Sequence, residues 1–141
     1  MGLTDDGAIA IASALIGDGL VPLFTNANAA IGVGNNGTTF AVGQDMLISE
    51  TSSASSATDN LRKAMDATYP QRDPDSDGSD NLIRFKATFG TTEGNFHWKE
   101  VGVFNSDTAG AGTMLLRVVQ DLGTKTSADT WVATLDVTVD A

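Results

Sequence analysis

The sequence predicts a mainly β protein, an antiparallel β-sandwich or small barrel with a short N-terminal helix. The first observation is the period-two alternation of apolar and polar residues in 83–89 and 131–139, which is typical of strands with one buried and one solvated face. The second is the regular spacing of short extended segments between glycine-containing turns. These segments are 81–89, 95–104, 113–121 and 130–139.

Residues 4–16 have the pattern of a short helix. Thr4 fits the N-cap position, and the two aspartates that follow it lie in the first turn, where the helix dipole favours negative charge. Gly17 is expected to end the helix. Because so short a helix is unstable alone in water, its apolar stripe must be covered by the chain's own sheet or by a neighbouring subunit. The stripe consists of Ile9, Ala12, Leu15 and Ile16.

Short apolar runs separated by turn residues fill the segment 20–43. Residues 30–33 predict a strand, 35–37 (Asn-Asn-Gly) predict a tight turn, and 38–42 predict a return to extended structure. The glycines here lack the spacing, the following lysine and the helix of a phosphate-binding loop, so we expect no nucleotide site. They are Gly32, Gly34 and Gly37.

Two polar segments separate the N-terminal third from the main run of strands. Residues 51–58 (TSSASSAT) predict a flexible surface loop. Residues 60–69 fit either a strand or a helix, and Pro70 ends that segment in both cases.

The acidic stretch 71–80 predicts a charged turn between two extended segments. Its Asp-x-Asp-x-Asp-Gly motif matches the opening of a calcium-binding loop, but the twelfth position is Arg84 instead of the bidentate glutamate. We therefore expect a solvated hairpin loop, with a weak calcium or sodium site as the alternative. The candidate ligands are Asp73, Asp75 and Asp77.

The predicted strands supply the expected structural core: Phe85, Phe89, Trp98, Phe104, Leu116 and Trp131. Glu100 is expected on the same strand face as Trp98. A buried carboxylate without a partner is costly, so Glu100 needs a cation from a neighbouring strand. The candidates are Arg84, Lys86 and Arg117.

The residue types available argue against an enzyme. The chain has no cysteine and one histidine, His97, which alternation places on the polar side of its strand. It has no Gly-x-Ser-x-Gly motif. Glu93 and Glu100 are seven residues apart, which places them on opposite faces of a regular strand, and a turn containing Gly94 lies between them, so we expect no carboxylate pair. We expect no catalytic residues, no cofactor and no metal beyond the weak acidic-loop candidate.

The net charge of −10 narrows the set of partners. An acidic surface repels nucleic acid and anionic membrane surfaces, and no apolar run approaches the ~18 residues of a membrane span. Asp5 and Asp6 argue against a signal peptide, so we expect a soluble protein made in a cytoplasm. The acidity is also compatible with a halophilic source.

The most distinctive local string is WKEVGVF, residues 98–104, which lies within FKATFGTTEGNFHWKEVGVFN and is followed further along by TMLLRVVQDLGTKTSADTWVATLDVTV. The two longer strings contain an aromatic-x-glutamate-x-glycine-hydrophobic-Phe strand, a glycine-rich turn, a Leu-Leu-Arg strand and an LGTKT turn. In this they resemble small virion structural proteins of tailed phages and related viruses. Upstream, AAIGVGNNGTTFAVGQDMLISE is similar to the β-turn-β opening of phage tail-collar fibre regions, and LRKAMDATYP also fits the pattern. The resemblance covers roughly residues 26–139.

The resemblance implies a non-enzymatic, surface-exposed virion subunit that is assembled in the host cytoplasm and contacts other virion proteins. Because no repeat or tip follows up to Ala141, we expect a compact accessory subunit instead of a long fibre. A tail-tip, fibre-base or baseplate position and a capsid decoration or turret position both remain open. The alternative is a carbohydrate- or receptor-binding β-sandwich that attaches to a host surface receptor, which would need displayed aromatic side chains.

Residues 1–19 are expected to form an N-terminal helix or arm, and residues 20–141 a single β-sandwich domain. The apolar segment 20–33 adds more apolar surface than a small sandwich needs. We therefore expect a homo-oligomer, a trimer or a ring, with residues 1–30 at or near the subunit contact.

Overall fold

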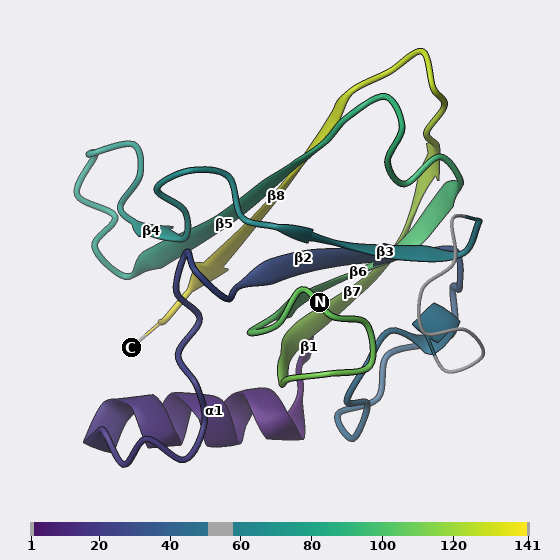
Figure 1. Ribbon diagram of the computed structural model, residues 1–141. Coiled ribbons are helices and arrows are strands. Elements are labelled where there is room, and N and C mark those ends of the chain that lie inside the picture. Colours follow the sequence, from purple (N-terminus) through teal and green to yellow (C-terminus); the bar gives the residue numbers. More distant parts are fainter. Residues whose placement is uncertain (1, 51–57, 141) are drawn as a thin grey trace.

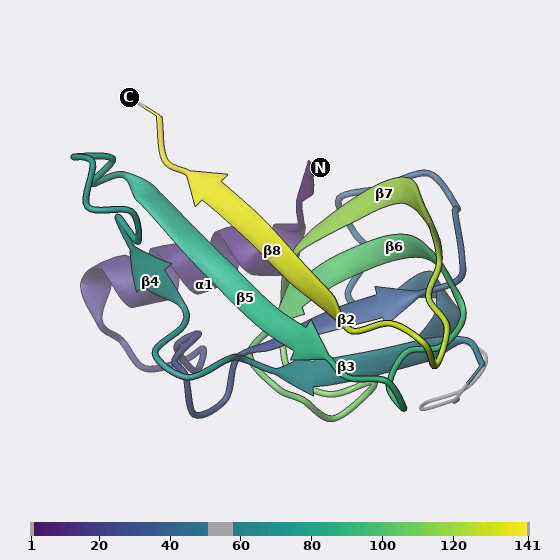
Figure 2. The same ribbon diagram turned by 90° about the horizontal axis from the view of Figure 1, so that it is seen from above.

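The computed structural model describes residues 2–50 and 58–140, which form two antiparallel sheets and one helix (Figure 1). One sheet has five strands in the order β1-β7-β6-β2-β3, and the other has three in the order β4-β5-β8. The smaller sheet lies across the larger one (Figure 2), and within the described residues the two do not close into a barrel. The elements are β1 (Gly2–Leu3), α1 (Asp5–Ile16), β2 (Ala30–Gly34), the 3-10 turn η1 (Ile48–Glu50), β3 (Asn60–Ala64), β4 (Gln71–Arg72), β5 (Leu82–Phe89), β6 (His97–Phe104), β7 (Met114–Thr124) and β8 (Trp131–Thr138).

The predicted mainly β class is confirmed, and the four segments of the C-terminal half correspond to β5, β6, β7 and β8. The ambiguous segment 60–69 begins with a strand, β3. The extended segment expected at 38–42 is wrong as a strand, because β2 already pairs with β6 on one edge and with β3 on the other. The polar loop expected at 51–58 lies almost entirely outside the described residues.

The core between the sheets contains most of the predicted residues. Phe85, Phe89, Trp98 and Leu116 are all buried there. Trp131 lies at the open edge of the sandwich, is only half-buried, and meets the ring of Trp98 edge-on with 5.0 Å between ring centroids. Two residues expected on the buried faces of strands lie outside this core. Phe104 is buried in a separate cluster with Leu47 and Met114, and Val139 is exposed beyond the end of β8.

Glu100 does not share the inner strand face with Trp98, contrary to the sequence-based expectation. The register between β6 and β7 shifts between these two residues, advancing two residues along β6 and four along β7, and this bulge interrupts the regular alternation of faces. Val101 therefore continues the core of Trp98, while Glu100 points to the outer face of the five-stranded sheet.

Glu100 is fully buried on that outer face, and its partner is Arg117, one of the three expected candidates. The Arg117 Nε donates to the Glu100 carboxylate at 2.7 Å. The same carboxylate accepts from the backbone N–H groups of Ile48 and Ser49 at 3.0 and 2.9 Å, and from the Ser49 hydroxyl at 2.6 Å. The ion pair therefore also holds η1 against the sheet.

A second buried ion pair fixes the other end of η1. Arg62 of β3 donates to Glu50 through Nε and Nη2, each at 2.8 Å, and its guanidinium lies 3.5 Å from the centroid of the Phe104 ring. Glycines make room for this layer. A Cβ at Gly34 would lie 2.0 Å from the Ser49 hydroxyl oxygen, so no larger residue fits there without a shift.

The helix α1 has the predicted boundaries. The Thr4 side chain accepts from the Gly7 N–H at 2.9 Å, and Gly17 ends the helix in the left-handed conformation. The helix packs on β7 so closely that a Cβ at Gly7 would lie 2.1 Å from the Leu115 carbonyl oxygen. Its buried residues are Gly7, Ala10 and Ser13.

Candidate interaction surfaces

The apolar stripe predicted on the helix is not covered by the chain's own sheet. Leu15 is 85% exposed and Ile16 is 76% exposed, because the helix turns its small residues toward β7 instead. The segment after the helix adds Leu20 at 80% exposure. We call these exposed residues the α1 surface. They are Ile9, Ile11, Leu15, Ile16, Leu20 and Leu23.

The helical part of the α1 surface has no charged side chain, and Asp18 lies between Ile16 and Leu20 in the sequence. Ile11 and Leu23 line the same shallow groove of about 200 Å³ between the helix and the segment that follows it. Between Asp6 and Asp18 the sequence has no charged residue. Asp18 lies at the turn after the helix, where hydrogen bonds from the Ser13 hydroxyl and the Leu20 N–H lower its pKa. A concentration of exposed large apolar side chains in one segment, 9–23, is typical of an interaction site.

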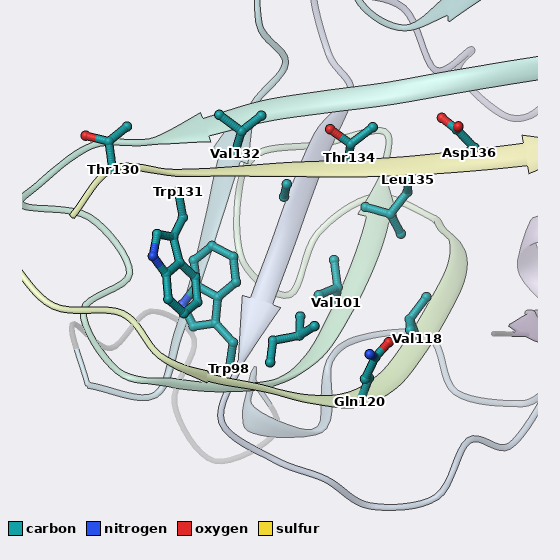
Figure 3. Close-up of a pocket in the computed structure, with 12 residues that line it drawn as sticks. Trp98, Val101, Val118, Gln120, Thr130, Trp131, Val132, Thr134, Leu135 and Asp136 are labelled. Carbon is teal, nitrogen blue, oxygen red and sulfur yellow. The ribbon is translucent and has the colours of Figure 1, made fainter.

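A second candidate surface is a cleft of about 710 Å³ at the open edge of the sandwich, between β7 and β8 (Figure 3). Trp131 and Leu135 point from β8 toward the five-stranded sheet, where they face Trp98 and Val101 of β6 and Val118 of β7. The remaining lining residues are Gln120, Leu122, Thr130, Val132, Ala133, Thr134 and Asp136.

The strand β8 forms one border of this cleft and is an edge strand of its sheet. The Val139 N–H donates to the Asn81 carbonyl at 2.9 Å, so in the antiparallel ladder the odd-numbered residues of β8 bond to β5. The backbone groups of the even-numbered residues then point away from β5, along the free edge. These are Val132, Thr134, Asp136 and Thr138.

The opposite border of the cleft is also only partly paired. The short strand β1 bonds only to Leu116 and Arg117 of β7. From Val118 onward, no described strand pairs with that edge of β7. The two sheets therefore end in unpaired edges on the same side of the molecule.

Asp136 brings an anchored negative charge to the outer face of β8. Its carboxylate oxygens accept from Arg84 Nε and Nη2 at 2.7 and 2.8 Å, and this pairing lowers the pKa of Asp136. Arg84 also binds Asp75 of the acidic loop at 3.0 Å, and the two carboxylates, Asp136 first, raise the pKa of the guanidinium.

The acidic loop uses its carboxylates for internal contacts. Asp73 accepts from the backbone N–H groups of Asp77 and Gly78 at 3.1 and 3.3 Å, while Asp75 pairs with Arg84. Hydrogen bonds from Ser79 lower the pKa of Asp77. Within residues 2–50 and 58–140, no group of three acidic or histidine side chains is arranged to hold a metal ion.

The other titratable residues considered for catalysis form separate contacts. Glu93 accepts from Lys63 at 2.5 Å and from the Gly90 N–H at 2.9 Å, which lowers the pKa of Glu93. His97 lies 2.5 Å from Asp121 on the surface, and this contact lowers the pKa of Asp121. Glu93 and Glu100, the two glutamates considered as a carboxylate pair, therefore do not lie in one site.

Sequence reasoning missed the cleft, although it selected both tryptophans. Alternation identified Trp98 and Trp131 as inward-facing residues but contained no information about which strands form the sheet edges. No local signal marks the cleft, because the alternation in 131–139 reports the buried face of the strand and not its neighbours in the sheet.

No protein-family model matches the chain, and the curated proteins include no significant match to its sequence. Among the described residues, no helix is long and apolar enough to span a bilayer.

Proposed function

We propose that the protein is a non-enzymatic structural subunit of a tailed-virus virion that assembles with copies of itself through the α1 surface. The observation that carries the proposal is the exposure of Leu15, Ile16 and Leu20 in a single copy. Each of these side chains gains about 1.5–3 kcal/mol when it is fully buried, so leaving all three in water is unfavourable. The resemblance of the strand and turn motifs to small virion proteins supports the same class.

Charge favours a second copy of the chain as the occupant of the α1 surface. With a net charge of −10, two copies repel each other over most of their surfaces. The stretch between Asp6 and Asp18 is uncharged, so copies can meet there without opposing carboxylates. Ala8 and Ala12 are exposed on the same helix, and such small side chains let two helices approach closely.

The assembly can be tested with the double variant Leu15→Asp/Ile16→Asp. Its matched control is Val139→Asp, because Val139 is 64% exposed, apolar and lies just after the end of β8, outside the α1 surface. By sedimentation velocity at micromolar concentration, we expect a defined oligomer for the wild type and the control, and a monomer for the double variant. All three should show the same circular dichroism spectrum, because the altered side chains are exposed.

Two results would contradict the proposal. If the wild-type chain sediments as a monomer, the protein does not self-assemble under these conditions. If the double variant still forms the oligomer, the subunits contact each other through another surface. The virion assignment is tested by antibody labelling of purified particles in the electron microscope. We expect labels at regular positions on the capsid or the tail, and particles without label would refute this part of the proposal.

A further inference from the structure

We propose that the cleft between β7 and β8 binds an extended strand of a partner protein, whose side chains alternate between apolar and basic residues, by pairing with the free edge of β8. This inference goes beyond self-assembly and uses a different surface. It rests on backbone pairing, on the shape of the cleft and on charge.

The sheet architecture leaves a place for one more strand. The five-stranded sheet is covered by only three strands, and β8 ends that smaller sheet. The N–H and C=O groups of Val132, Thr134 and Asp136 point along the free edge and can form a new antiparallel or parallel ladder. Addition of a strand to an exposed edge is a common mode of peptide recognition.

The cleft beneath this edge accepts apolar side chains. A strand added beside β8 points every second side chain toward the five-stranded sheet. There those side chains meet Trp131 on one wall, and Val101 and Val118 on the other. The volume of about 710 Å³ is ample for several of them.

The outer face of β8 favours basic residues at the outward-pointing positions of the added strand. The alternate side chains of the added strand lie beside those of Val132, Thr134 and Asp136, and opposite charges on neighbouring strands attract. Asp129, which is exposed, directly precedes the lining residue Thr130 in the sequence. A second copy of a chain with net charge −10 is a poor source of such a strand, so the partner is a different, more basic protein.

The ring geometry disfavours a sugar ligand in the cleft. Sugars stack on open aromatic faces, but Trp98 is only 2% exposed and its indole N–H donates to the Gly94 carbonyl at 2.8 Å. Trp131 meets Trp98 edge-on, with an angle of 77° between the ring planes. The two rings therefore form a packed wall instead of a flat platform.

Tryptophan fluorescence gives a direct assay, because the only two tryptophans of the chain both line the cleft. The probe is a capped peptide of about eight residues that alternates Val and Lys, which is long enough for one strand. We expect a saturable blue shift of the emission. A peptide that alternates Val and Glu, and a block peptide of the Val-Lys composition, are expected to bind at least about tenfold more weakly.

The variant Thr134→Pro tests the role of the β8 edge. Proline removes an N–H that points away from β5, so the ladder between β5 and β8 keeps its hydrogen bonds. We expect Thr134→Pro to bind the peptide at least about tenfold more weakly than Thr134→Ala, which also lacks the threonine side chain but retains the N–H. Amide hydrogen exchange of the wild-type chain gives a second readout, in which the peptide should slow exchange at Val132, Thr134 and Asp136.

The following results would overturn the proposal. The block peptide could bind as tightly as the alternating Val-Lys peptide. Addition of the alternating peptide could leave amide exchange at β8 unchanged. An oligosaccharide, but not the peptide, could give a saturable fluorescence response. If Thr134→Pro fails to fold, the exchange measurement on the wild type decides the question. The monomeric Leu15→Asp/Ile16→Asp variant should bind the peptide normally, so failure of the self-assembly proposal and failure of this one are distinguishable.

Discussion

Replacing Glu100 by glutamine should destabilise the protein severely, although the two side chains have almost the same shape. The change removes the negative charge that pairs with Arg117, and both side chains of this pair are fully buried. Breaking a buried ion pair from one side costs about 3–5 kcal/mol, because the other charge stays buried without its partner. The glutamine NH₂ group also faces donors instead of accepting from them, so at least one buried donor next to it is left unsatisfied.

The expected total is a loss of about 4 kcal/mol in the free energy of unfolding, a large part of the ~5–15 kcal/mol that a domain of this size has. Arg117 keeps other acceptors, the Thr38 carbonyl at 2.9 Å and the Gln44 side chain at 3.1 Å, so the loss should stay at this level. With a urea slope of about 2 kcal/mol per molar, the unfolding midpoint falls by about 2 M.

The assay is urea unfolding followed by tryptophan fluorescence. The matched control is Asp80→Asn, which breaks the exposed ion pair with Arg72 and should cost at most about 1 kcal/mol. A double variant, Glu100→Gln/Arg117→Met, should be more stable than the sum of the two single changes predicts, because it removes the unpaired charge. A loss below about 1 kcal/mol for Glu100→Gln would refute the account of this site as a tightly coupled buried pair.

Three further predictions concern other parts of the fold. Gly34→Ala should lower the free energy of unfolding by about 3 kcal/mol in urea melts, because its Cβ would lie 2.0 Å from a side-chain oxygen. Gly37→Ala, where the nearest atom would be 3.7 Å from the Cβ, should change little, and equal effects of the two variants would contradict this reasoning. Trp131→Ala should lower the free energy of unfolding by about 2 kcal/mol, less than the ~3–5 kcal/mol for a fully buried aromatic residue, because the Trp131 side chain is half-buried. A loss under about 1 kcal/mol would show that the ring contributes little to the core. Folding lowers the pKa values of Asp136 and Glu93 from 3.8 and 4.5, so the stabilisation from these carboxylates is present above those values and is lost as the pH falls through the lowered pKa values. The urea concentration at the unfolding midpoint should therefore decrease as the pH is lowered from about 5 to about 2, and an increase on acidification would contradict this prediction.

Strands and helix ends could be predicted from local patterns. The alternation in β5 and β8 reports one buried face directly, and Thr4 and Gly17 mark the helix ends through their own cap chemistry. The need of Glu100 for a cation also followed from the sequence, because burial of a lone carboxylate is costly in any fold.

Features that depend on tertiary pairing could not be predicted. The bulge before Glu100 moves this residue to the opposite face, and nothing in the local pattern marks it. The segment 38–42 has the composition of a strand, but β2 has no free edge to receive it. The orientation of α1 depends on Gly7, whose missing side chain lets the helix lie directly on β7 and turns Leu15 outward.

Strand β7 serves both proposed surfaces, and this has a consequence for affinity. Its first half carries β1 and α1, and its free second half borders the cleft. An oligomer held together through α1 would therefore present one cleft per copy at fixed spacing and in fixed orientation. A partner with several suitable strands, or a symmetric partner, would then bind by avidity, because each first contact raises the effective concentration for the next to about the millimolar range. Pairing of a single strand can be weak and reversible during assembly, while the completed complex dissociates very slowly.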